Sequence, residues 1–153
     1  MVGVAVVVGV AVGAGVAGMS VASLEFVVTG DPVAKGRARS TKSGRHYTPT
    51  KTRDWENWVA MMALSKVAET FTGPVRLTLV ARVRRPKSRP KRCRLPDRRP
   101  DLDNYIKAAM DGLQKSGVWI DDAQVCELIA EKVYHDKPGL EIKIEALDYE
   151  EKP

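Results

Sequence analysis

The sequence predicts a single small α+β domain, in which two main helices pack on a mixed β-sheet in the order β-α-β-α-β-β. A length of 153 residues suits one domain with an ordinary core. Apolar residues recur at helical spacing in two stretches and alternate at strand spacing in others. Clusters of Gly, Pro, Asp and Ser separate these stretches. Strands and helices of this kind form one layered domain.

The first half predicts a strand, a basic loop and a helix. Residues 24–28 are mostly apolar and end at a Thr-Gly-Asp-Pro turn, which indicates a short strand. Residues 35–49 are rich in Lys, Arg, Ser and Gly and predict a loop. Residues 50–69 carry apolar side chains at helical spacing, so both Trp55 and Trp58 are expected in the core.

The second half predicts a strand, a long loop, a helix and two more strands. Residues 75–83 alternate as a half-buried strand does. Residues 82–100 contain four prolines and predict an extended, irregular loop. Residues 102–113 have one apolar face and predict a helix that ends before a Ser-Gly pair. A terminal β-hairpin is expected from residues 125–133 and 140–147.

Residues 1–23 carry no charge and consist mainly of Val, Ala and Gly. The glycines disfavour a membrane-spanning helix, and the basic start of a signal peptide is missing. Because Met19 could itself begin a compact domain, residues 1–18 are expected to be dispensable. We therefore predict a disordered extension or a mis-assigned start over residues 1–23, a folded domain over 24–150 and no membrane association.

The charge distribution predicts binding to a polyanion. Residues 1–100 hold 19 basic and 6 acidic side chains, whereas residues 101–153 hold 6 and 13. Nucleic acid is the commonest polyanion in cells, although a solvated basic loop is the alternative. The side chains expected to contact DNA are Lys35, Arg37, Arg39, Tyr47, Arg85, Lys87, Arg89, Lys91, Arg92, Arg98 and Arg99.

Two cysteines and two histidines leave little material for several kinds of site. Cys93 and Cys126 are too few for a disulfide framework and predict reduced thiols in a cytoplasmic protein. A Ser-His-Asp triad or a zinc site with several histidine ligands has little to draw on. Carboxylates that bind a hard metal ion remain available.

The acids that follow the basic loop predict such a metal site. Asp101 and Asp103 can project to the same side before the helix begins, and Asp121 or Asp122 can supply a third carboxylate. These are suitable ligands for Mg²⁺, with Mn²⁺ as an alternative. The metal would activate a bound water and neutralise a phosphate. Lys107 lies one helical turn after Asp103 and could place its ammonium against a phosphate oxygen.

Each of these residues also has an ordinary structural interpretation. Asp101 and Asp103 suit the start of a helix, and Asp121 and Asp122 suit a turn. Lys107 and Asp103 have the spacing of a surface ion pair. Their combination next to the basic loop favours the metal site.

Two segments resemble the signature of the RusA family of Holliday junction resolvases. They are residues 97–113, which include Asp-Leu-Asp-Asn followed by Lys107, and residues 117–125, which include Asp-Asp-Ala-Gln. The earlier Tyr-Thr-Pro at residues 47–49 also fits, so the resemblance covers about residues 24–147. The uncharged start and the long basic loop depart from the family pattern.

The resemblance implies a homodimeric, Mg²⁺-dependent endonuclease that binds four-way DNA junctions and nicks two opposed strands in recombination and repair. It implies that Asp101, Asp103 and Asp122 are the metal-binding catalytic acids and that Lys107 is an essential lysine, with Asp121 set aside. A cytoplasmic protein of a bacterium or phage is expected. The alternatives are a nuclease for flaps or other branched DNA, and a DNA-binding protein without catalysis.

Overall fold

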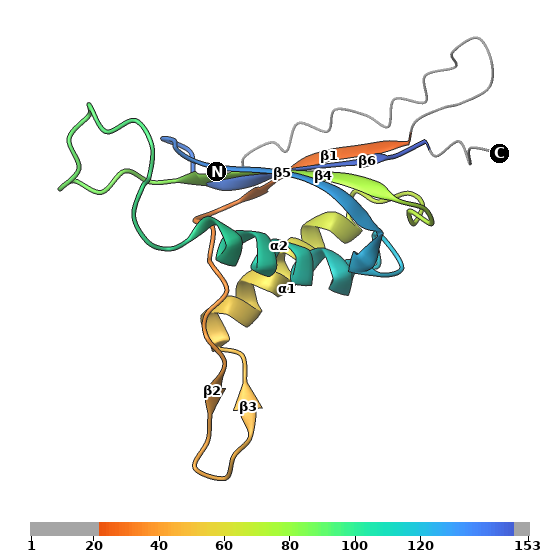
Figure 1. The fold of residues 1–153 in the computed structure, drawn as a ribbon, viewed down its shortest axis with the longest axis horizontal. Coiled ribbons are helices and arrows are strands. Elements are labelled where there is room, and N and C mark those ends of the chain that lie inside the picture. Colours follow the sequence, from red (N-terminus) through yellow and green to blue (C-terminus); the bar gives the residue numbers. More distant parts are fainter. Residues whose placement is uncertain (1–21, 149–153) are drawn as a thin grey trace.

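The computed structural model describes residues 22–148, which form a four-stranded sheet with both main helices on one face (Figure 1). This confirms the predicted α+β class and order; the expected extension lies outside the described residues, except for its last two positions. The elements are β1 (Ser23–Thr29), β2 (Arg39–Ser40), β3 (His46–Tyr47), α1 (Thr50–Leu64), β4 (Val75–Val83), α2 (Leu102–Ser116), the short 3-10 helix η1 (Asp122–Gln124), β5 (Val125–Tyr134) and β6 (Gly139–Ala146).

The sheet has the strand order β1-β6-β4-β5, so the predicted terminal hairpin is wrong. β5 pairs with β4 in parallel, and β6 pairs antiparallel with both β4 and β1. The reason is that α2 forms a crossover that returns the chain parallel to β4. Residues 135–138 then pass the end of β4, where the His135 N–H donates to the Val83 carbonyl at 3.0 Å. β5 therefore forms an edge of the sheet.

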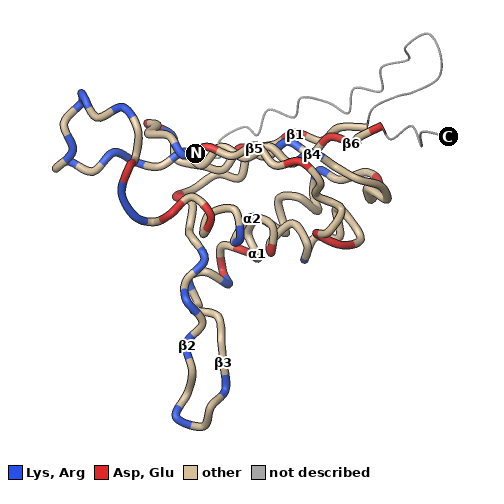
Figure 2. Tube along the Cα trace, in the orientation of Figure 1, with Lys and Arg blue, Asp and Glu red and all other residues tan. Residues whose placement is uncertain are grey.

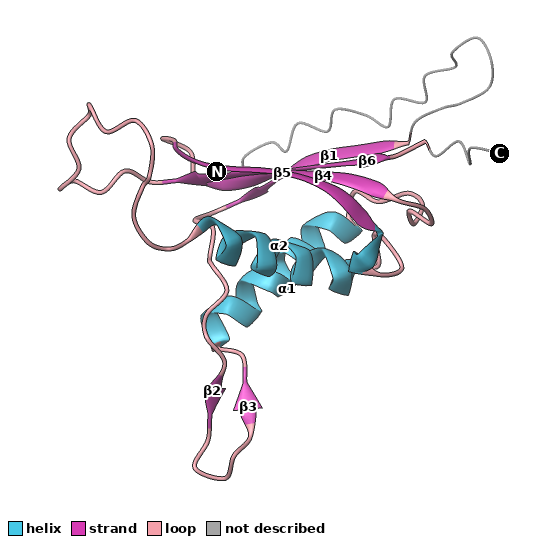
Figure 3. Ribbon diagram, in the orientation of Figure 1, coloured by secondary structure: helices cyan, strands magenta, loops and turns pink. Residues whose placement is uncertain are grey.

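The core lies between the sheet and the two helices, as Figure 3 shows in side view. Alternate residues of β1, β4 and β6 face the helices and are buried, among them Leu77 on β4 and Ile142 on β6. Trp55 is buried as predicted. Trp58 is 39% exposed, and its indole N–H donates a hydrogen bond to the Thr29 carbonyl at 2.9 Å. The helical spacing thus identified the inner face of α1 but overestimated its width.

The two helices are in close contact at Gly112. A Cβ atom added there would lie 2.7 Å from the Val59 Cβ and 2.8 Å from the Glu56 carbonyl oxygen. Contacts this short leave no room for any side chain. Gly117 ends α2 in the left-handed conformation, with φ of 72°. These two glycines fix where α2 lies beneath the sheet and where it stops.

Two basic segments project from this body, as the blue stretches of Figure 2 show. One is loop 84–100. The other is a hairpin of β2 and β3 within residues 35–49, where the sequence predicted only a loop. Its strands have two residues each and are exposed, so they carry no apolar alternation that could reveal them. Within the described part of the chain, no helix is long and apolar enough to cross a bilayer.

Candidate metal centre and nucleic-acid surface

Asp101 and Asp103 stand exposed where α2 begins. Asp101 occupies the N-cap position, with φ of −73° and ψ of 147°, but its side chain makes no capping hydrogen bond. The Asp103 carboxylate has one ion pair among the described residues, with the Lys107 ammonium at 3.2 Å and on the surface. Helix capping therefore does not account for the Asp101 side chain, and both carboxylates retain free oxygens for a hard cation.

The backbone around these acids is fixed by two lysines. The Lys132 ammonium, on β5, donates to the carbonyls of Arg98 and Pro100, each at 2.8 Å. The backbone N–H of Lys35 donates to the Asn104 carbonyl at 2.8 Å. Sequence reasoning did not find Lys132, because in the sequence it is one of several polar residues in an alternating strand. The contacts connect the start of α2 to the sheet edge and to the base of the hairpin.

Asp122 lies at the opposite end of α2 from Asp101 and Asp103. The helix has 15 residues and is therefore about 22 Å long. η1 follows its C-terminal end, as Figure 1 shows. No group of three His, Cys, Asp or Glu side chains within residues 22–148 is arranged to hold a metal ion. The expectation that Asp122 returns to the other two acids within one chain is wrong, because the crossover helix separates them.

Asp121 and Asp122 differ in how their side chains are used. Asp121 forms a capping box for η1: its carboxylate accepts from the Ala123 N–H at 2.8 Å, and its own N–H donates to the Gln124 side chain at 3.0 Å. Asp122 is exposed and has no side-chain hydrogen bond or ion pair with any described residue. Asp121 thus has a structural role, and Asp122 keeps a free carboxylate.

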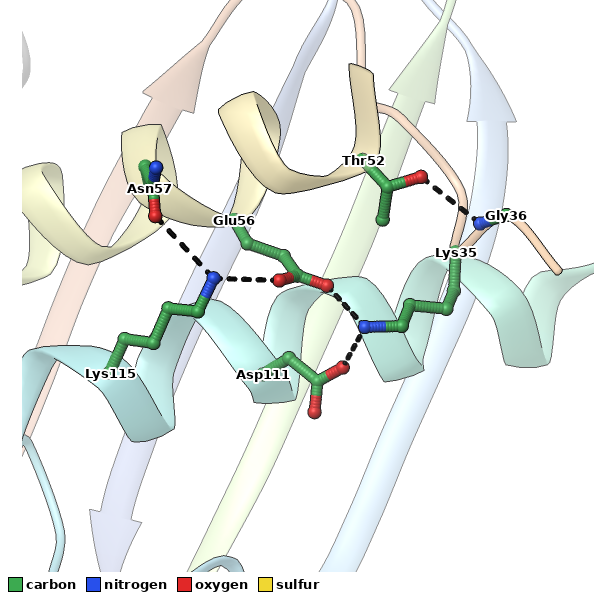
Figure 4. A network of polar contacts seen from close by, with 7 residues as sticks. All are labelled: Lys35, Gly36, Thr52, Glu56, Asn57, Asp111 and Lys115. Carbon is green, nitrogen blue, oxygen red and sulfur yellow. Dashed lines mark hydrogen bonds and ion pairs between the residues drawn. The ribbon is translucent and has the colours of Figure 1, made fainter. Parts of the chain in front are cut away.

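An ion-pair network around the buried Glu56 connects the base of the hairpin to both helices (Figure 4). The Lys35 ammonium lies 2.5 Å from the Glu56 carboxylate and 2.6 Å from that of Asp111, and Lys115 contacts Glu56 at 2.8 Å. Burial alone would raise the pKa of Glu56, but the hydrogen bonds from Lys115 and Lys35 outweigh it and lower that pKa. Lys35, which we expected to contact DNA, is engaged in this network.

Two of the arginines expected to contact DNA, Arg85 and Arg89, make contacts within loop 84–100. The Arg85 guanidinium donates to the carbonyls of Pro90 and Cys93 and lies 4.4 Å from the centre of the Tyr134 ring. Arg89 forms an ion pair with Asp97. The other expected contacts are exposed in the structure: Arg37, Arg39, Tyr47, Lys87, Lys91, Arg92, Arg98 and Arg99.

Comparison with known proteins gives a consistent result. Residues 29–145 match the family model described as endodeoxyribonuclease RusA. A Bacillus subtilis (strain 168) protein, described as uncharacterized protein YqaN, is 33% identical over 135 residues, which are 79% of this chain and 94% of the relative. The crossover junction endodeoxyribonuclease RusA of Shigella sonnei is 34% identical over 112 residues, 72% of this chain and 78% of that protein. The Escherichia coli (strain K12) protein of the same name is 52% identical over 54 residues, 34% of this chain and 45% of its own length.

Proposed function

The chain belongs to the RusA family of endodeoxyribonucleases, and from this premise we propose that it resolves four-way DNA junctions by nicking two opposed strands in recombination and repair. The observation that carries the proposal is the exposed pair Asp101 and Asp103, which lies directly after the basic loop within the matched residues. The loop offers cations to the DNA backbone. The acids offer a metal site at the point where that backbone would arrive.

Mg²⁺ is the metal that these residues suit best. Two exposed carboxylates with free oxygens are hard ligands, and Mg²⁺ commonly binds one or two carboxylates together with phosphate oxygens and water. When bound, the metal supplies charge neutralisation and an activated water. Lys107, one turn along α2, holds its ammonium beside the Asp103 carboxylate and stabilises negative charge on the phosphate.

We further propose that a second subunit supplies Asp122. The length of α2 keeps Asp122 of the same chain about 20 Å away, whereas ligands of one metal ion lie a few ångströms apart. A homodimer with two equivalent sites also suits the paired cleavage of a symmetric junction. The partner would then contribute a ligand to each site.

The outer edge of β5 is the surface best suited to this assembly. β5 pairs only with β4 within the described sheet, and it exposes Leu128 and Ile129 by 45% and 55%. Ile120, just before η1, is 66% exposed. An open strand edge with apolar side chains is a template for pairing with another strand. A second β5 offers a matching edge of equal length.

Antiparallel pairing of two β5 strands would bring the acids together. With the strands aligned over their full length, Val125 of one chain lies opposite Tyr134 of the partner subunit. The end of β5 is beside the start of α2, because Lys132 holds the Pro100 carbonyl. Asp122 of the partner subunit, three residues before its β5, would therefore lie near Asp101 and Asp103.

Cleavage assays with Asp103→Asn test the catalytic role. We expect this variant to bind a four-way junction but to lose cleavage in Mg²⁺, whereas Asp54→Asn, an exposed aspartate on α1, keeps wild-type cleavage. Junction, flap and linear duplex are compared side by side. Undiminished cleavage by Asp103→Asn would disprove the metal role. Equal cleavage of all three substrates would instead point to a general nuclease, and faster cleavage of the flap to a flap-directed one.

A further inference from the structure

A pocket of about 380 Å³ lies beside the start of α2, between loop 84–100 and the end of the sheet. Tyr105 on α2 and the two β5 residues Lys132 and Tyr134 contribute to its walls, and the loop contributes Arg98, Arg99 and Pro100. Pro100 directly precedes Asp101 in the chain. The pocket is thus adjacent to the candidate metal site, but it contains neither of the two acids.

Lys132 is the unusual member of this pocket. Its side chain is half-buried, yet it has no ion pair with any carboxylate among the described residues. An ammonium has three N–H donors, and the carbonyls of Arg98 and Pro100 take two of them. One donor and the whole positive charge therefore remain without a partner in residues 22–148.

The surroundings add further positive charge rather than neutralise it. Arg98 and Arg99 line this wall, are exposed and have no ion pair with a described residue, whereas the exposed Arg84 pairs with Asp31 at the surface. Arg89 also lines the pocket and forms an ion pair with the exposed Asp97. A half-buried cation without a counter-ion is unfavourable unless an anion joins it. The chemistry of the pocket therefore fits an oxyanion with several acceptor oxygens.

We propose that Lys132 anchors a subsite for a DNA phosphate next to the phosphate that is cut. This inference rests on the proposed function and deepens it. Lys132 holds the backbone of the segment that leads into Asp101, so the same ammonium that binds the neighbouring phosphate also sets the position of the acids. Binding at this subsite would align the DNA strand with the metal site before cleavage. Arg98 and Arg99 stand beside Lys132 to contact the same strand.

Binding experiments test the subsite without any need for cleavage. The dissociation constant for a four-way junction is measured from 50 to 200 mM salt in Ca²⁺, for wild type, Lys132→Gln and Lys132→Arg. One lost phosphate contact lowers the slope of log K against log salt by about 0.9. The affinity deficit of Lys132→Gln should therefore shrink about 3.5-fold across this range, whereas Lys132→Arg keeps the wild-type slope. Lys66→Gln is the matched control, because Lys66 is also half-buried and has no ion pair within residues 22–148, but lies just beyond α1.

Neutral phosphates in the DNA identify the contact directly. A methylphosphonate is placed in turn at each phosphate around the branch point of the junction. At one position it should weaken binding by wild type while leaving binding by Lys132→Gln unchanged. A Lys132→Gln variant with the wild-type salt slope, or a scan in which every position weakens both proteins equally, would overturn the subsite. Neither readout requires catalysis, so a protein that binds but does not cut would contradict only the proposed function.

Discussion

A mixture of two inactive variants should recover activity if the metal site is shared between subunits. One variant carries Asp103→Asn and the other Asp122→Asn. In a mixed dimer, one site then combines both substitutions, whereas the other site combines only native acids. Random assortment makes half of the dimers mixed, and each has one intact site out of two. The mixture should therefore contain about a quarter of the wild-type number of intact sites.

A plasmid that extrudes a cruciform distinguishes a dimer with one intact site from a dimer with two, because paired nicks linearise the circle and a single nick only relaxes it. The two variants are co-expressed with different tags, and the mixed dimer is isolated through both. We expect it to produce mainly nicked circles, while each variant alone leaves the plasmid intact. If the mixed dimer is as inactive as its parents, the acids act within one chain. That result would refute the reasoning from the length of α2.

Two further predictions concern the support of α2. Glu56→Gln removes the carboxylate that Lys35 and Lys115 share, so the free energy of unfolding at pH 7, measured by chemical denaturation, should fall by about 2 kcal/mol. The control is Glu69→Gln at an exposed position, which should cause no measurable change. Because the pKa of Glu56 is lowered in the folded protein, its contribution is complete above the ordinary value of 4.5 and is lost as pH falls through the lowered value. The gap between wild type and Glu56→Gln should therefore narrow in acid, and a gap independent of pH would contradict this account. Gly112→Ala should lower stability by about 1 to 2 kcal/mol, since the clash with Val59 outweighs the gain in helix propensity. Gly73→Ala is its control, because the added Cβ there meets nothing within 4 Å. Equal midpoints of denaturant unfolding for the two variants would show that the helices can move apart at Gly112 without loss of stability.

Local patterns predicted the two helices and the four long strands but not all of the strand pairings. The alternation in β4 and the apolar face of α2 depend on which residues are buried, and burial leaves a period in the sequence. Strand partners depend on the path of the chain between them. The Asp-Lys-Pro-Gly segment after β5 looks like a hairpin turn, yet it crosses the end of β4. The β2–β3 hairpin was missed because its four residues are exposed and have no apolar face.

The candidate site was predictable to the same extent. Asp101 and Asp103 are only two positions apart in the chain, so their proximity needed no knowledge of the fold. The position of Asp122 depends on the direction of a whole helix, which a sequence motif does not reveal. Charge alone also could not separate Lys35, engaged with Glu56 and Asp111, from the exposed Arg37 two residues later.

The contacts that attach the β2–β3 hairpin to the body of the protein allow its length to change without moving α2. At its base, the Gly36 N–H donates to the Thr52 hydroxyl at 3.1 Å, and the Lys35 ammonium donates to the Asp111 carboxylate. At its tip, the Thr41 N–H donates to the Arg45 carbonyl at 2.9 Å, so this hydrogen bond lies within the hairpin itself. A Cβ added at Gly44 would meet nothing within 4 Å. Residues can therefore be inserted or removed at the tip without moving α2. Evolution, or a protein engineer, can change how far this arm projects from the body of the protein and leave Asp101 and Asp103 in place.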